Sequence, residues 1–222
     1  MTNEEILGRV DHTLLKAAAT WEEIKTLCDE ALRFKTAAVC IPPSYVRPVY
    51  NEYGSSLVID TVIGFPLGYS IAAAKVLEAE RAVQSGAKEI DMVINLGDVK
   101  NGHFDWVLEE IKLVKKAAGR GILKVIVETC YLTEDEKICL CGIVTEAGAD
   151  YIKTSTGFGS AGAVLADVEL FKRHVGAAVK IKAAGGIRAR EDFDAFIAAG
   201  ADRIGTSAAV KLLTQGGSAG GY

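Results

Sequence analysis

The sequence lacks the marks of membrane, secreted and nucleic-acid-binding proteins. Its apolar runs fall short of the roughly 18 residues that a membrane-spanning helix needs, and Met1–Ile6 is polar and acidic, unlike a secretory signal. A basic face for nucleic acid is not expected either, because the formal net charge is −4 and the pI is near 5.5. We therefore expect a cytoplasmic protein that binds neither membrane nor nucleic acid.

Paired cysteines and clustered histidines are also missing. The five cysteines are an odd number without a CxxC spacing, which indicates free thiols in a reducing compartment. Cys139 and Cys141 lie two apart in a predicted helix and therefore face different sides, which makes them a poor metal pair. The three histidines are scattered, and His12, which lies near a strand end, is expected to be structural. We expect no metal and no cofactor.

A regular alternation of short β-rich runs with amphipathic helical segments dominates the chain. Half of the 222 residues are hydrophobic, which is enough for a substantial core. Eight such units in this length predict a (β/α)8 barrel over residues 1–215, followed by a Gly- and Ser-rich tail, residues 216–222, that we expect to be mobile. The predicted strands are Val10–Leu15, Thr36–Ile41, Leu57–Ile63, Glu89–Ile94, Ile122–Glu128, Tyr151–Ser155, Val179–Ala183 and Arg203–Ser207. The predicted helices include Trp21–Phe34, Ala72–Ser85, Phe104–Ala118, Glu134–Ala147, Val164–Val175 and Glu191–Ala199.

Charged residues interrupt strands that should be apolar on both faces. Side chains along a barrel strand alternate between the helix layer and the barrel interior. Where the apolar residues of a strand share one face, the charged residues must point inward. This parity directs inward Glu89, Asp91, Lys124, Glu128, Lys153, Lys180 and Lys182.

Buried charges are costly, so these residues need an explanation. A structural network of lysine–carboxylate pairs accounts well for Glu89, Lys124 and Glu128. It accounts poorly for Lys153 and Lys182, which end successive strands, because barrel active sites lie at the C-terminal ends of the strands. Clustered ionisable groups in a low-dielectric interior are typical of catalysis.

The two lysines suggest a specific chemistry. A lysine amine that a neighbouring cation keeps neutral attacks a carbonyl carbon, and the resulting iminium accepts the electrons of a breaking or forming C–C bond. We expect Lys153 to be this nucleophile, with Lys182 as the neighbouring cation. Asp91 would then transfer protons directly or through water.

Glycine-rich segments follow the last three predicted strands. In barrels, backbone N–H groups of such loops often bind phosphate, together with a helix N-terminus. Three loops of this kind at corresponding strand ends predict a phosphorylated substrate. The residues expected to bind it are Thr154, Gly157, Gly185, Gly186, Arg188, Gly205 and Ser207.

Eight motifs occur in order along the chain: Asp11-His-Thr-Leu-Leu-Lys16, Ala38-Val-Cys40-Ile, Gly64-Phe-Pro-Leu-Gly68, Glu89-Ile-Asp91-Met-Val-Ile-Asn95, Lys124-Val-Ile-Val-Glu128-Thr-Cys130, Lys153-Thr-Ser-Thr-Gly157-Phe158, Lys182-Ala-Ala-Gly-Gly-Ile-Arg188 and Arg203-Ile-Gly-Thr-Ser207. Together they resemble the deoxyribose-phosphate aldolases, a family of class I aldolases, along nearly the whole length. The resemblance implies reversible cleavage of 2-deoxy-D-ribose 5-phosphate to acetaldehyde and glyceraldehyde 3-phosphate. It implies Lys153 as the Schiff-base lysine, Lys182 as the second lysine that tunes it, and Asp91 as the acid/base.

Three further roles follow from the resemblance alone. Asp11 would belong to a supporting relay, and Cys40 would line the substrate site, although a small core residue is an equally good interpretation of this cysteine. Tyr222, at the end of the tail, would reach the active site and assist proton transfer, unless it is simply part of a disordered terminus. The family also suggests a homodimer or homotetramer.

Some positions depart from the family pattern. Tyr69–Ala73 replaces a polar stretch that usually contains two threonines, Pro42 stands where Asn is common, and Ala208 stands where the family usually has a second serine. Loss of the hydroxyl at position 208 removes a phosphate hydrogen bond. We therefore expect weaker dependence on the substrate phosphate.

Other functions remain open at this point. A transaldolase-like or keto-acid aldolase would use the same Schiff-base chemistry with another donor, such as dihydroxyacetone units or pyruvate. A catalytically inactive barrel could bind a sugar phosphate for regulation. A metal-dependent class II aldolase lacks support, because the scattered histidines offer no ligand set.

Overall fold

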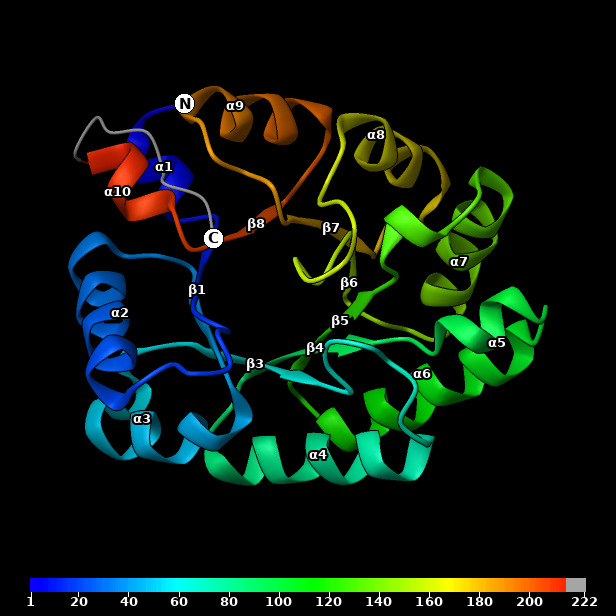
Figure 1. The fold of residues 1–222 in the computed structure, drawn as a ribbon, viewed down its shortest axis with the longest axis horizontal. Helices are drawn as coiled ribbons and strands as arrows, with labels where there is room; N and C mark the ends of the chain where they lie inside the picture. The colour runs from blue at the N-terminus through cyan, green and yellow to red at the C-terminus, as the bar shows by residue number, and fades with distance from the viewer. Residues whose placement is uncertain (215–222) are drawn as a thin grey trace.

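Eight parallel strands close into one barrel, and helices surround it (Figure 1). The computed structural model describes residues 1–214. Strands pair in sequence order and β8 returns to β1, so the sheet has no free edge and the predicted barrel is confirmed. The strands are β1 (Val10–Thr13), β2 (Ala38–Ile41), β3 (Ile59–Ile63), β4 (Glu89–Val93), β5 (Ile122–Ile126), β6 (Tyr151–Lys153), β7 (Lys180–Ala184) and β8 (Arg203–Thr206).

Helices fill the connections between the strands. Thr20 and Thr133 cap two of them with capping boxes, as their positions before Glu-rich turns predict. Gly86 and Gly200 end two others with φ of 115° and 119°, the left-handed conformation that glycine adopts at low cost. The helices are α1 (Asn3–Leu7), α2 (Trp21–Phe34), α3 (Val46–Tyr53), α4 (Ala72–Ser85), α5 (Leu96–Lys100), α6 (Phe104–Ala118), α7 (Glu134–Glu146), α8 (Leu165–His174), α9 (Arg190–Ala199) and α10 (Ala209–Thr214). Within residues 1–214, none of them is long and apolar enough to cross a membrane.

Most helix boundaries agree with the sequence pattern. The bounds of α2, α4 and α6 match the predicted segments, and those of α7, α8 and α9 differ by one residue at one or both ends. The short helices α1, α3, α5 and α10 go beyond the segments named from the sequence, and three 3₁₀ turns occur at Pro43–Tyr45, Gly54–Ser56 and Thr129–Tyr131.

Side chains alternate along each strand between an apolar core shared with the helices and the centre of the barrel. Residues such as Ile90 and Met92 point outward and form one apolar core with the helices. Val62, Val93 and Ile126 are also buried but lie outside that core. They share the inward parity of the charged residues, so the barrel centre is a separate, largely polar compartment.

The prediction that every inward-directed lysine is buried is wrong for one residue. Lys180 was expected inside the barrel beside Lys182, but it is exposed at the start of β7. Its Nζ lies 5.8 Å from the centre of the Tyr151 ring. Parity fixes the direction of a side chain, whereas burial also requires the strand to continue beyond it, and Lys180 stands at the rim.

Candidate active site

A layer of eight charged side chains fills the barrel centre. Seven of them are almost fully buried, and Arg203 is 12% exposed. The acids come from β1, β3 and β4, and the cations come from β5, β6, β7 and β8. Four carboxylates therefore face four cations, and the layer is formally neutral. Its members are Asp11, Asp60, Glu89, Asp91, Lys124, Lys153, Lys182 and Arg203.

Lys124 is the central cation of this layer. Its Nζ lies 2.6 Å from Glu89, 2.9 Å from Asp91 and 3.1 Å from Asp60. Asp11 lies at 3.7 Å. Burial alone would lower the pKa of Lys124, but the surrounding carboxylates outweigh burial and raise it. Lys124 is therefore a permanent ammonium, and the structural network predicted for Lys124 and Glu89 is present.

Asp91 joins the two lysines that end successive strands. Its Oδ2 accepts a hydrogen bond from Lys153 Nζ at 2.6 Å and another from Lys182 Nζ at 2.6 Å. Burial opposes ionisation, but Lys124, Lys153 and Lys182 hold the pKa of Asp91 well below its usual range. The expected proximity of the two lysines is correct, but a carboxylate lies between them.

Lys182 has two further carboxylate partners. Asp11 Oδ2 lies at 2.5 Å and Asp60 Oδ2 at 3.1 Å from its Nζ. Burial would lower the pKa of Lys182, but Asp11, Asp60 and Asp91 together raise it well above the usual lysine value. On the other side, Arg203 pairs with Asp11 at 2.5 Å. Burial would raise the pKa of Asp11, but Lys182, Lys124 and Arg203 lower it to about 2.

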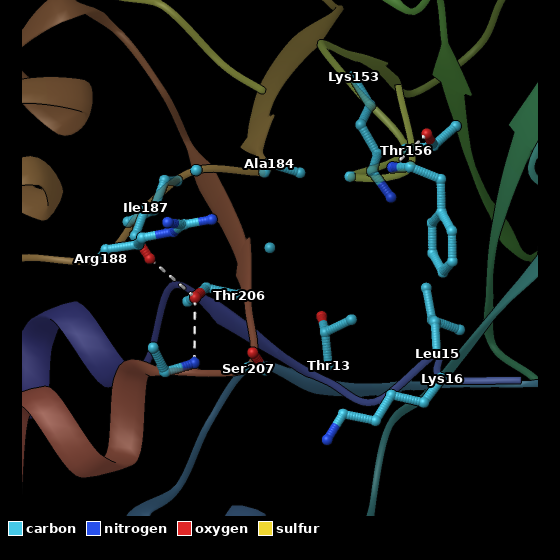
Figure 2. A pocket seen from close by; sticks show the side chains of 16 residues that line it. Thr13, Leu15, Lys16, Lys153, Thr156, Ala184, Ile187, Arg188, Thr206 and Ser207 are labelled. Carbon is cyan, nitrogen blue, oxygen red and sulfur yellow. Dashed lines mark hydrogen bonds between the residues drawn. The ribbon is translucent and has the colours of Figure 1, made fainter. Parts of the chain in front are cut away.

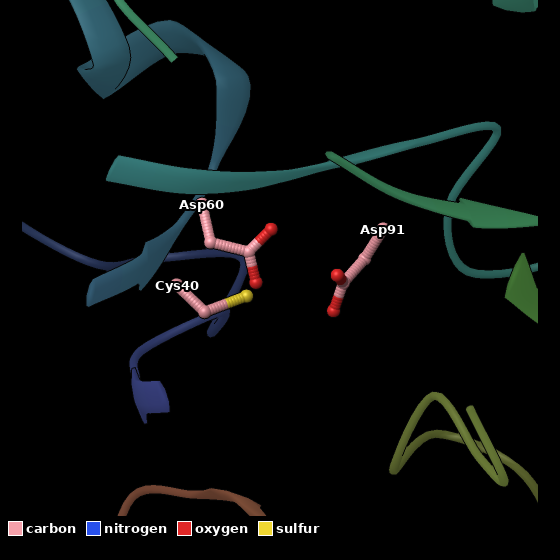
Figure 3. A group of neighbouring side chains, drawn as sticks. All are labelled: Cys40, Asp60 and Asp91. Carbon is pink, nitrogen blue, oxygen red and sulfur yellow. The ribbon is translucent and has the colours of Figure 1, made fainter. Parts of the chain in front are cut away.

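Asp60 is a functional candidate that the sequence interpretation missed. It is fully buried on β3, and Figure 3 shows its carboxylate beside Cys40 and on the same side of the barrel as Asp91. Burial and the nearby charge of Asp91 raise the pKa of Asp60 to about 6. The same alternation that identified Asp91 would have identified it, because Ile59 and Ile63 face the helix core.

The Cys40, Asp60 and Asp91 side chains are close enough to suggest a metal site (Figure 3). However, the carboxylate oxygens already face ammonium groups from Lys124 and Lys182 at 2.6–3.1 Å. Burial raises the pKa of the Cys40 thiol well above its usual value, which disfavours the thiolate form that binds metals. The cluster is therefore better explained as an ion network.

A cavity of about 310 Å³ lies at the C-terminal ends of β6, β7, β8 and β1. Lys153 is the only member of the charged layer that lines it. Figure 2 shows the Lys153 amine on one side of the open space and the side chains of Arg188, Ser207 and Lys16 bordering it elsewhere. The geometry thus presents only Lys153 of the charged layer to a ligand and keeps its charged partners beneath it.

Comparison with known proteins agrees with this architecture. The model of the DeoC/LacD family aldolases matches residues 6–220. This chain belongs to that family. It is 58% identical over 220 residues to a deoxyribose-phosphate aldolase of Clostridium botulinum (strain Alaska E43 / Type E3), an alignment that covers 97% of this chain and 100% of that protein.

Two further relatives of this aldolase extend the comparison. A deoxyribose-phosphate aldolase of Clostridioides difficile (strain 630) is 56% identical over 210 residues, which cover 95% of this chain and 96% of that protein. The deoxyribose phosphate aldolase from Aeropyrum pernix, whose structure is described as a unique tetramer, superposes with a TM-score of 0.87 at 32% identity, covering 96% of this chain and 91% of that chain.

Most of the residues predicted to bind substrate line the cavity of this aldolase. They are Gly157, Gly185, Gly186, Arg188, Gly205 and Ser207. Gly185 and Gly186 have φ of 82° and 76°, so the loop after β7 uses a conformation that other residues adopt only with strain. Lys16, an exposed lysine after β1, also lines the cavity and was not predicted.

Two predicted binding residues lie beneath the cavity instead of lining it. Thr154 is buried, and its hydroxyl donates to the Ala184 carbonyl at 3.2 Å and accepts from the Ala184 N–H at 3.1 Å, which ties β6 to β7. Cys40 is buried beside Asp60. Gly205 has a second role, because a Cβ at this position would lie 3.1 Å from Lys182 Cε. Tyr222 lies outside the described residues.

Glu128 is structural, as expected, but its partner is not the one that was expected. Glu128 was expected to pair with lysine in the barrel network. Instead, its carboxylate accepts hydrogen bonds from the Thr156 N–H at 3.1 and 3.2 Å and from the Thr156 hydroxyl. Glu128 has φ of 54° and lies beyond the end of β5, so its side chain holds the loop that carries Gly157. His12 binds Glu30 of α2 at 2.8 Å, as expected of a structural residue.

Proposed function

We propose that this aldolase reversibly cleaves 2-deoxy-D-ribose 5-phosphate to acetaldehyde and D-glyceraldehyde 3-phosphate through a Schiff base on Lys153. The observation that carries the proposal is the position of Lys153, whose amine enters the cavity while its counterions stay buried below it. The names of the relatives support the substrate, and the chain covers nearly all of their length.

Each neighbouring group has a chemical task in this proposal. The Lys153 amine attacks the carbonyl carbon, and the iminium withdraws electrons from the C–C bond that breaks. Asp91 accepts the proton that leaves the Lys153 ammonium, because the two groups are 2.6 Å apart. Lys182 remains an ammonium that holds Asp91 in place, and Asp11 supports Lys182 from below.

The opposite end of the cavity would hold the substrate phosphate. Arg188 and Lys16 bring positive side chains to the cavity, and Ser207 adds a hydroxyl. The positive-φ glycines Gly185 and Gly186 leave backbone N–H groups accessible to an anion. Ala208 also lines the cavity but offers no hydroxyl, which supports a relaxed dependence on phosphate.

Reductive trapping tests the Schiff base. Wild-type protein is treated with acetaldehyde and borohydride, and the modified peptide is identified by mass spectrometry. We expect an ethyl group on Lys153, no trapping and no cleavage in Lys153→Met, and normal behaviour in Lys180→Met, which changes an exposed lysine of the next strand. Trapping that persists in Lys153→Met contradicts the proposal.

Donor and phosphate preferences separate the alternatives. Acetaldehyde as the donor supports the proposed reaction, whereas pyruvate or dihydroxyacetone units would indicate a different Schiff-base aldolase. For the phosphate, kcat/KM is compared on deoxyribose 5-phosphate and deoxyribose in the wild type and in Ala208→Ser. We expect the added hydroxyl to increase the preference for the phosphorylated sugar, and an unchanged ratio would exclude a role for position 208.

The oligomeric state is a further part of the proposal. We infer a homodimer or homotetramer, since the relative from Aeropyrum pernix is described as tetrameric. Sedimentation of the purified protein would test this, and a monomer at all concentrations would refute it.

A further inference from the structure

The proposed reaction leaves two acids of the charged layer, Asp60 and Glu89, without a task. Asp60 is fully buried, and its Oδ2 contacts Lys182 at 3.1 Å while Oδ1 lies 3.1 Å from Lys124 without a well-formed hydrogen bond.

The charge balance of the layer gives Asp60 a purpose. With every group ionised, four acids face four cations. When the Lys153 amine loses its proton to become a nucleophile, the buried layer carries one uncompensated negative charge, which is costly in a low-dielectric interior. Neutrality returns only if one of the acids takes up a proton.

We propose that Asp60 holds the proton that Lys153 releases when its amine becomes the nucleophile. Asp60 acts through Asp91 and Lys182, so it is a positioning residue for the proton and does not touch the substrate. This inference rests on the proposed Schiff base at Lys153.

The proton would move along three contacts already present. The first contact joins Lys153 Nζ to Asp91 Oδ2 at 2.6 Å. The second joins Asp91 Oδ2 to Lys182 Nζ at 2.6 Å, and the third joins Lys182 Nζ to Asp60 Oδ2 at 3.1 Å. One proton passes from Lys153 to Asp91, one from Asp91 to Lys182 and one from Lys182 to Asp60. The net result is a neutral amine and a neutral carboxylic acid, while Asp91 and Lys182 keep their charges. After the amine adds to the carbonyl, the proton returns and the carbinolamine hydroxyl leaves as water, so atoms and charge balance.

The other acids of the layer are poorer acceptors. Asp11 pairs with Arg203 and Lys182 and has a pKa of about 2, despite its burial. Glu89 pairs with Lys124 at 2.6 Å and with Arg203 at 3.4 Å. By contrast, the pKa of Asp60 is raised to about 6, mainly by burial and next by the charge of Asp91.

Several charged or titratable groups of the described chain lie close to Asp60. The charged or titratable groups close to it, one element at a time, are Asp11 on β1, Cys40 on β2, Glu89 and Asp91 on β4, Lys124 on β5 and Lys182 on β7. The Cys40 thiol stays protonated, because burial and the charge of Asp60 raise its pKa.

A titration of Asp60 tests the inference without relying on turnover. The carboxyl carbon is followed by NMR in wild type and in Lys153→Met, and Asp60→Asn assigns the signal by its disappearance. We expect loss of the Lys153 charge to raise the pKa of Asp60 by about one pH unit or more, a tenfold change in proton affinity. If the pKa of Asp60 is the same in Lys153→Met as in the wild type, the inference is overturned. If Lys153→Met does not fold, Lys153→Gln replaces it.

The pH profile of kcat/KM provides the second test. Wild type and the control Glu80→Gln should share an acid limb near the pKa of about 6 that belongs to Asp60. Glu80→Gln is the control, because it removes an exposed acid of α4 outside the charged layer. Asp60→Asn should remove this limb, because asparagine does not titrate. A limb that stays in place overturns the inference, whereas borohydride trapping that survives in Lys153→Met contradicts the proposed function itself.

Discussion

Removing the central cation of the barrel should destabilise the fold strongly, although Lys124 lies too deep to touch a substrate. Lys124 is fully buried and lies within 3.1 Å of the carboxylates of Asp60, Glu89 and Asp91. Lys124→Met keeps a side chain of similar length and removes the charge, which leaves four acids facing three cations. Breaking a buried ion pair from one side costs about 3–5 kcal/mol.

The magnitude is large against the stability of a domain. A loss of this size takes about a fifth or more of the roughly 5–15 kcal/mol that folded domains have, and in a chain of this length it should lower Tm by roughly 6–20 °C. Thermal and urea unfolding, followed by circular dichroism near neutral pH, would measure it. Lys116→Met, at an exposed position of α6, is the control and should change stability by less than about 0.5 kcal/mol.

The pH dependence of this loss distinguishes charge from packing. Without Lys124, the pKa of Asp60 should rise above its value of about 6, because a cation that lowers it is gone. The folded variant then takes up a proton at higher pH than the wild type, so the stability gap should narrow as pH falls toward about 6 and change little below it. A gap of under about 1 kcal/mol near neutral pH, or one that does not change with pH, would refute a low-dielectric ion network.

Two further changes address the geometry and the charge of the layer. Gly205→Ala would bring a Cβ to 3.1 Å from Lys182 Cε. We therefore expect kcat/KM to fall roughly tenfold or more and the free energy of unfolding to fall by about 1–3 kcal/mol. Kinetics equal to those of the wild type would show that Lys182 moves aside freely. Asp11 has a folded pKa lowered to about 2, so its contribution to stability, about 2 kcal/mol, is present above pH ~4 and lost as pH falls toward ~2. Asp11→Asn should lack this loss in acid-unfolding curves, and an unchanged slope there would contradict the assignment.

The alternation of apolar and polar residues predicted most of the fold and the chemistry. The runs around Asp91, Lys153 and Lys182 identified inward charged groups because the outward residues must pack on helices. The same rule applied to Leu57–Ile63 would have identified Asp60, but that run was interpreted only as a strand. Parity misjudged Lys180 because it carries no information on where the barrel rim lies.

The binding loops were harder to predict because their contacts depend on ring closure. Pairing of β8 with β1 brings Lys16 and Ser207 to one cavity, although they are far apart in sequence. Lys16 ends the first motif of the family resemblance, but neither strand parity nor a glycine-rich loop marks it as a cavity residue. Thr154 follows Lys153 directly and was expected to contact substrate, but its hydroxyl binds the backbone of Ala184 on the neighbouring strand instead.

The distribution of charge around the barrel suits the position of Lys153, the amine that we propose as the nucleophile. Acids come from β1, β3 and β4 and cations from the run β5 to β8, so the two signs meet across the interior. A lysine deep in this layer, such as Lys124, is surrounded by carboxylates and remains charged. Lys153 stands at the top of the layer, with Asp91 as its one ion-pair partner within residues 1–214 and the cavity on its other side. Reactivity thus depends on depth, because only at the boundary does a lysine have both a proton acceptor behind it and room for a carbonyl in front.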